Sequence, residues 1–192
     1  YTLWARFDGA TDTVLNVFNF NAIGGAPTNR FYHKDNSSYN GGVLSKTYGT
    51  WSPTLTGSPT LNRPFDSYLT IGGLPTATNT TAADPSWPAP AGWNRADVPS
   101  GLNVGWYNSS PPNLQGRVGS TGNTATDVRL GQFVIDAGTD IGDFNLKTAY
   151  NNGVTGSPVQ FAETTFHLGT PVPGPGALAL LGLAGLAGRR RR

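Results

Sequence analysis

The chain has 192 residues, only 12% of them charged, and it contains no cysteine, which excludes disulfides and thiolate metal sites. Four of its thirteen Lys and Arg residues are the last four positions, and the rest of the chain carries nine cationic and eleven acidic residues. That balance, without a basic patch interleaved with aromatic residues, argues against a nucleic-acid partner. Glycine (26) and proline (15) are abundant, so turn formers outweigh helix formers.

The N-terminal segment alternates between apolar and polar residues. Leu3, Ala5 and Phe7 fall on one face of residues 1–8, which is typical of a half-buried strand. A turn-rich tetrapeptide and a second β-rich segment at 13–20 follow directly. The opening of the chain is therefore predicted to be a β-hairpin.

Further short strands are predicted along the chain by alternation and by flanking turn residues. Their ranges are 43–51, 67–71, 102–106, 114–118, 127–136, 143–150 and 159–168. In the last of them the apolar phase slips between Phe161 and Phe166, which predicts a β-bulge near 162–165. About nine short strands of this kind predict an all-β fold, a single jelly-roll-like β-sandwich over residues 1–170.

Tryptophans mark a long segment that lacks periodicity. Residues 72–101 contain five prolines, and such a segment within a compact domain is typical of a functional surface loop. Trp87 and Trp93 lie six residues apart in it, and Trp106 follows. Open, coplanar rings would suit sugar binding, whereas buried rings would indicate a role in the core or in an interface.

An acidic cluster forms the strongest candidate metal site. Asp136, Asp140 and Asp143 follow one another closely around glycines, and their oxygens could hold Ca²⁺. Their spacing does not match an EF-hand loop, so solvated turn aspartates remain the alternative. No other cofactor is expected.

Catalytic patterns are weak throughout the sequence. The chain has one glutamate, Glu163, so a pair of glutamates for acid/base chemistry is excluded, and two aspartates remain the alternative for such a pair. His33 and His167 accompany no nucleophile elbow and no zinc-binding spacing, and both are interpreted as surface histidines. A non-enzymatic protein is therefore predicted.

The C-terminal segment, residues 171–192, has three parts in order. They are a Pro/Gly breaker, an apolar run at 176–188 that predicts a short hydrophobic helix, and an arginine cluster. As a helix the run would measure roughly 20 Å, less than the roughly 30 Å hydrocarbon core of a membrane. The residues of the breaker and the cluster are Pro173, Gly174, Pro175, Arg189, Arg190, Arg191 and Arg192.

This arrangement resembles a PEP-CTERM sorting signal, in which the position of Gly174 is usually a glutamate. The resemblance implies an exported bacterial protein, displayed at the cell surface or in the extracellular matrix, whose tail meets a membrane and an exosortase. Positive charge after the apolar run agrees with the rest of the chain lying outside the membrane. The low-charge body, rich in Thr, Asn and Gly, also resembles the cargo of this family. We expect a structural protein that assembles into filaments or fibres with copies of the same chain. The alternative is a carbohydrate-binding module that contacts extracellular polysaccharide.

Overall fold

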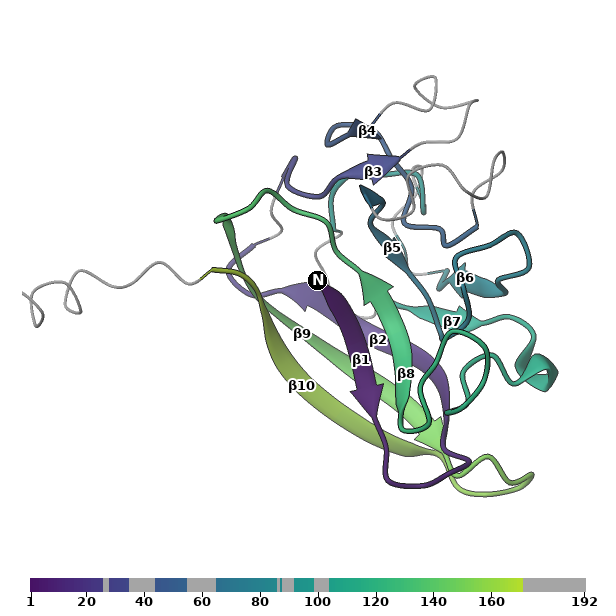
Figure 1. Ribbon diagram of the computed structural model, residues 1–192. Coiled ribbons are helices and arrows are strands. Elements are labelled where there is room, and N and C mark those ends of the chain that lie inside the picture. Colours follow the sequence, from purple (N-terminus) through teal and green to yellow (C-terminus); the bar gives the residue numbers. More distant parts are fainter. Residues whose placement is uncertain are drawn as a thin grey trace, which may run out of the picture.

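The computed structural model describes residues 1–25, 28–34, 44–54, 65–85, 87, 92–98 and 104–170. Their secondary structure is almost wholly β, and two antiparallel sheets lie against each other, as Figure 1 shows. The predicted all-β class is therefore confirmed. The predicted C-terminal helix and the whole tail, residues 171–192, lie outside the described residues.

The larger sheet has five strands in the order β10-β9-β2-β7-β6. Their bounds are β2 (Thr13–Ala22), β6 (Thr81–Ala83), β7 (Trp106–Asn108), β9 (Asp140–Asn151) and β10 (Gln160–Gly169). The smaller sheet has the order β1-β8-β5, with bounds Thr2–Arg6, Asp127–Gln132 and Tyr68–Leu69. A two-stranded sheet joins β3 (His33–Lys34) to β4 (Leu44–Ser45), and a 3-10 helix, η3, spans Pro111–Asn113.

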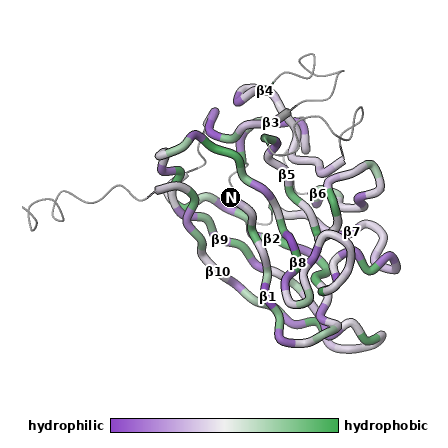
Figure 2. The backbone as a smooth tube through the Cα atoms, in the orientation of Figure 1, coloured by the Kyte–Doolittle hydropathy of each residue, from purple (hydrophilic) through white to green (hydrophobic). Residues whose placement is uncertain are grey.

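The side chains of β9 alternate between the core and the outer face, so one face of this strand borders the core. Phe144, Leu146 and Thr148 are buried on one face, as the sequence pattern predicts. Strand β2 lies beside β9 and contributes Val17 and Phe20 to the same interior. In Figure 2 these long strands carry hydrophobic positions at intervals, which is the pattern of a sheet with one face in the core.

The predicted N-terminal hairpin is wrong. Strand β1 pairs with β8 in the smaller sheet, whereas β2 pairs with β9 and β7 in the larger one. The turn between β1 and β2, closed by the bond from the Gly9 N–H to the Asp12 carboxylate (3.0 Å), carries the chain from one sheet to the other. Because β1 and β2 lie in opposite sheets, their apolar faces meet across the core.

The predicted bulge inside the last strand is also wrong. Strand β10 keeps a continuous register with β9 from Gln160 to Leu168, and its register shift lies between Leu168 and Gly169. Phe161 simply belongs to the outer face, where it is 66% exposed and meets Phe18 edge-on at 6.1 Å between ring centroids. The apparent slip in phase comes from an aromatic pair outside the core.

Several of the predicted segments differ from the structure, and strand β7 (Trp106–Asn108) meets the predicted strand 102–106 only at residue 106. Only residues 44–45 of the segment 43–51 form a strand, and residue 43 lies outside the described residues. Residues 114–118 form turns, because Leu114 has a left-handed backbone (φ 58°) and the Asn123 amide donates to the carbonyls of Gln115 and Arg117. The segment 72–101, expected to be a loop, contains strand β6.

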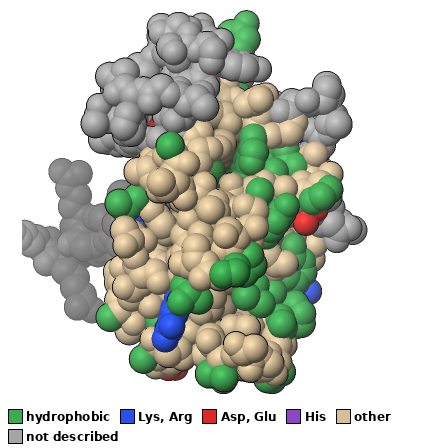
Figure 3. Space-filling view, turned by 90° about the vertical axis from the view of Figure 1, so that its right-hand side faces the viewer, with side chains coloured by type: hydrophobic (Ala, Val, Ile, Leu, Met, Phe, Trp, Pro, Cys, Tyr) green, Lys and Arg blue, Asp and Glu red, His purple; other side chains and the backbone are tan. Residues whose placement is uncertain are grey.

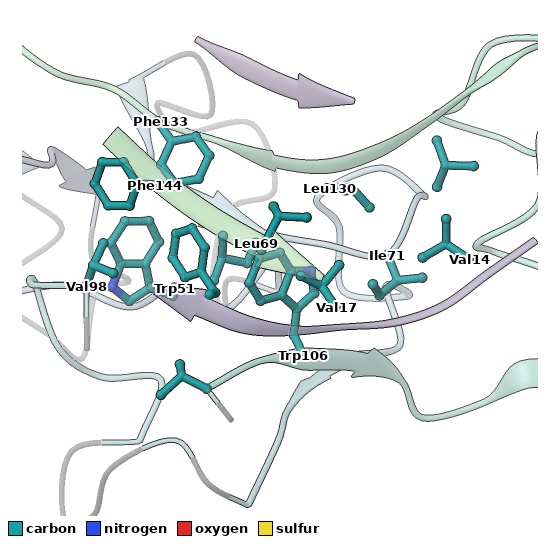
Figure 4. Close-up of a cluster of buried hydrophobic side chains, with 14 of the residues drawn as sticks. Val14, Val17, Trp51, Leu69, Ile71, Val98, Trp106, Leu130, Phe133 and Phe144 are labelled. Carbon is teal, nitrogen blue, oxygen red and sulfur yellow. The ribbon is translucent and has the colours of Figure 1, made fainter. Parts of the chain in front are cut away.

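Aromatic rings fill the space between the two sheets, as Figure 4 shows. Phe20 stacks on Phe144 with centroids 5.8 Å apart and meets Trp106 edge-on at 5.2 Å. Phe133, which follows β8, packs against the same cluster from the smaller sheet. One continuous core therefore joins the two sheets.

Candidate functional site

The candidate sugar-binding tryptophans lie mostly in the interior. Trp106 is 0% exposed and Trp87 is 4% exposed, while Trp93 is half-buried and packs against the core. The rings of Trp87 and Trp93 are 4.9 Å apart and tilted by 46°, so they form a packed pair and not a flat platform. Burial and tilt favour the alternative in which these rings attach the loop to the core.

The acidic cluster divides into two separate contacts. Asp136 accepts hydrogen bonds from the Tyr32 hydroxyl (2.8 Å) and from the Lys46 ammonium. Asp140 and Asp143 both face His167, at 3.2 Å and 2.8 Å from its ring nitrogens. Among the described residues no three His, Asp or Glu side chains gather in a way that could hold a metal ion.

Lys46 also determines the protonation of Asp136. The ammonium bond, followed by the bond from Tyr32, holds the pKa of the Asp136 carboxyl below its usual value. The Lys46 ammonium lies 4.4 Å from the centre of the Tyr32 ring as well. The three side chains form an ion-pair cluster in which Asp136 has two side-chain partners.

His33 is a buried residue and not a surface histidine, so that prediction is wrong. Its ring lies between the carbonyl oxygens of Ser67 (2.9 Å) and Ala96 (3.1 Å) and meets Trp51 edge-on. Burial lowers the pKa of His33, and the surrounding carbonyls oppose that shift only in part. The neutral ring therefore connects backbone segments as a structural hydrogen-bonding residue. His167 lies on the outer face as expected.

A polar hollow of about 450 Å³ lies beside the turn at residues 72–79. Its lining residues are uncharged. Figure 3 shows that charged side chains are also few on the face of the molecule that it draws. The Gln115 amide bonds to Thr80, Ile71, Asn79 and Thr81, so its hydrogen-bonding capacity is filled by the protein. The Asn79 amide likewise donates to Thr70, Gly72 and Leu74. Because both amides have partners within the protein, we interpret the hollow as part of the fold and not as a ligand site.

A long accessible feature of the described part of the chain is the outer edge of the five-stranded sheet. Strand β10 has ten residues and, within the described part of the chain, β9 as its neighbour in the sheet. It forms the left-hand border of the molecule in Figure 1. An open edge of this length offers backbone donors and acceptors to another strand.

The register determines which backbone groups of β10 are available. The Ile23 N–H donates to the Asp143 carbonyl (2.8 Å), so the backbone groups of Asp143 point toward β2. Alternation then directs those of Phe144 toward β10, where Phe166 is its partner. The N–H and C=O groups of the intervening residues of β10 consequently point outward. These residues are Phe161, Glu163, Thr165 and His167.

The side chains of the same four residues lie on the outer face of β10. Two of them, Glu163 and His167, are acidic or basic. Glu163 lies opposite Lys147 of β9, with 2.9 Å between carboxylate and ammonium. His167 lies opposite Asp143 of β9. Glu163 and His167 therefore lie two positions before and two positions after Thr165. Each of them already has a partner on the neighbouring strand β9.

A groove of about 240 Å³ runs between β10 and β1, the edge strand of the smaller sheet. Its floor includes Leu130 and Leu146 from the core. Ala5 contributes to one wall, and Ala162 and Thr164 contribute to the other. The two sheets are thus open toward solvent along this side, and the apolar interior is reached between two strand edges.

These features define an all-β protein of two antiparallel sheets whose candidate site is the open edge β10. Searches against protein-family models, curated proteins and solved structures found no match. Within the described ranges, no helix combines the length and apolar character that crossing a membrane requires. The tail residues that were predicted to serve for sorting or anchoring, from Pro173 to Arg192, lie outside the described residues.

Proposed function

We propose that the chain is a non-enzymatic structural protein, exported to the bacterial surface or extracellular matrix, which assembles with copies of itself into filaments or fibres. Residues 1–170 would form its jelly-roll-like β-sandwich, and the tail would serve for sorting, anchoring or assembly. The resemblance of the tail to an exosortase signal supports the export part of this proposal.

The open edge β10 is the observation that carries the assembly part. Natural proteins usually shorten, cover or charge their edge strands because an open edge pairs with other chains. Here the edge is ten residues long, and Phe161 is exposed at its beginning. Burial of Trp87 and Trp106 favours this proposal over a sugar-binding module, because stacking on sugar rings requires accessible aromatic faces.

The proposal is tested by the mass and shape of the full chain in solution. Light scattering after size-exclusion chromatography and negative-stain electron microscopy should show assemblies larger than the monomer, in proportions that rise with concentration. A version ending at Thr170 separates the contribution of the tail. Assembly that survives this truncation belongs to the β-sheet body, and assembly that disappears belongs to the tail.

A monomeric full chain at every concentration would contradict the proposal. Export is tested separately by expressing the chain in a bacterium that has an exosortase and treating intact cells with protease. Digestion of the chain in intact cells is expected. Protection until the cells are lysed would contradict surface display.

A further inference from the structure

We propose that β10 pairs antiparallel with β10 of a second copy, in the register that places Thr165 opposite the partner's Thr165. This inference rests on the proposed function and names the contact through which copies associate. The two five-stranded sheets become one continuous sheet across a two-fold axis.

Backbone geometry permits this pairing along the edge. Thr165 directs its N–H and C=O outward, and so do Glu163 and His167 on either side of it. In an antiparallel pair centred on Thr165, each of these residues exchanges two backbone hydrogen bonds with its opposite residue. The hydrogen bonds between β10 and β9 are kept, because they are made by the residues in between, such as Thr164 and Phe166.

Charge selects the register. With Thr165 at the axis, Glu163 of one copy lies opposite the partner's His167, and the partner's Glu163 lies opposite His167. Each cross-strand row of the joined sheet then contains Lys147 and Glu163 of one copy, followed by the partner's His167 and the partner's Asp143. The signs alternate along the row when His167 is protonated, and cross-strand pairs of opposite charge stabilise a sheet.

Neighbouring registers lack this complementarity. Centring the pair on Glu163 places two carboxylates directly opposite each other, which is unfavourable. Centring it on Thr164 places Phe161 opposite the histidine and Glu163 opposite Thr165, so the carboxylate has no basic cross-strand partner. Among these arrangements the one centred on Thr165 alone pairs both charged positions.

The groove between β10 and β1 supports the same contact. A two-fold axis perpendicular to the joined sheet leaves both smaller sheets on one side of it, so the two grooves adjoin. In this register Thr164, which lines the groove, lies opposite the partner's Phe166, and Ala162 lies opposite the partner's Leu168. These inner-face side chains lose contact with water. Because a two-fold contact closes on itself, growth of a fibre requires a second contact elsewhere.

Cysteine cross-linking of the full chain tests the register. The chain has no cysteine, so Thr165→Cys supplies a single thiol, which the two-fold axis brings opposite its own copy. Opposite Cα atoms of an antiparallel pair are about 5.5 Å apart, within the range that a disulfide spans. Mild oxidation should convert most of the chain into a covalent dimer that reducing agent reverses.

The matched control is Thr2→Cys, an exposed threonine on the other edge strand of the groove, β1. It should give little covalent dimer under the same oxidation. Assembly that persists while Thr165→Cys stays uncross-linked would overturn this register and leave the proposed function standing. Efficient cross-linking through Thr2→Cys would assign the contact to β1 instead. A chain that is monomeric throughout would overturn both proposals.

A charge reversal supplies a second, independent readout. Glu163→Lys places an ammonium opposite the partner's His167 at both ends of the pair and should weaken dimerisation about tenfold or more. Asp8→Lys makes the same change in net charge at an exposed position outside the edge and should leave the dimer constant nearly unchanged. Equal effects of the two variants would contradict the proposed register. Sedimentation equilibrium provides the dissociation constants.

Discussion

The indole of Trp106 donates its N–H to the backbone carbonyl of Thr70 at 2.9 Å, and this bond joins the two sheets inside the core. Trp106 lies in β7 of the larger sheet, and Thr70 directly follows β5 of the smaller one. Both residues are fully buried. A buried acceptor that loses its donor cannot turn to water instead, so the bond has structural consequences beyond its own strength.

Replacing Trp106 by phenylalanine should lower the free energy of unfolding by about 1–3 kcal/mol from the unsatisfied Thr70 carbonyl alone. Loss of ring volume adds to this cost. Trp4→Phe is the control, since Trp4 is partly exposed and should cost less than about 1 kcal/mol. Urea unfolding followed by far-ultraviolet circular dichroism measures both. Equal losses would show that the cross-sheet bond contributes nothing special.

His33 should make the protein less stable in mild acid. Its pKa is lower in the folded chain than the usual value of about 6.5, so the unfolded chain binds the extra proton first. The stabilisation is complete above pH of about 6.5 and decreases, by at most about 1.4 kcal/mol per pH unit, as the pH falls toward the folded pKa.

His33→Gln should flatten this dependence. Urea unfolding at a series of pH values provides the comparison. A neutral imidazole can donate to only one of its two carbonyl partners. If the wild-type protein gained stability on acidification, the carbonyls of Ser67 and Ala96 would be holding the ring protonated, contrary to this prediction.

Lys46→Met should raise the pKa of the Asp136 carboxyl toward the ordinary aspartate value. The Lys46 bond is the largest cause of the depressed pKa, and the Tyr32 hydroxyl is the next, so Tyr32→Phe should raise it less. Stability from this carboxylate is present above its unfolded pKa and is lost as the pH falls through the folded one. Carboxyl-carbon NMR titration follows Asp136 directly. Asp127, which pairs with Arg6, is the internal control and should not respond.

Gly105→Ala should destabilise the protein by about 1–3 kcal/mol or more, because the new methyl group would meet the carbonyl oxygen of Val17. Both backbones are constrained here by the sheet, so neither can move aside easily. Gly156→Ala is the comparison: its surroundings are open, and its positive φ of 81° alone should cost about 1 kcal/mol. Thermal unfolding of the two variants measures the difference. A smaller effect at Gly105 would contradict the close approach.

Local alternation was enough to predict several strands and their buried faces. The pattern of Phe144, Leu146 and Thr148 identified the inner face of β9, and Leu3, Ala5 and Phe7 identified that of β1. A side-chain period of two follows from the geometry of a single strand, whatever its neighbours are. Composition likewise indicated the all-β class before any pairing was known.

The candidate site depends on relations that no single segment contains. In the sequence, Phe161 interrupts the apolar alternation of its strand. The structure explains this interruption, because Phe161 lies on the outer face of β10 beside Phe18. Three aspartates close in sequence were separated by their partners, Lys46 for Asp136 and His167 for the other two.

The sequence alone thus determined where the longer strands β2, β9 and β10 lie and which of their faces are apolar, because side-chain alternation arises from neighbours along the chain. Only the tertiary structure decided that β1 and β2 belong to different sheets, that His33 is buried, and that β10 lies at the edge of its sheet among the described residues. Strand partners, burial and edges are set by contacts between residues far apart in sequence. This arrangement of the strands is stabilised because apolar side chains from all of them are buried together. No local sequence pattern specifies that burial.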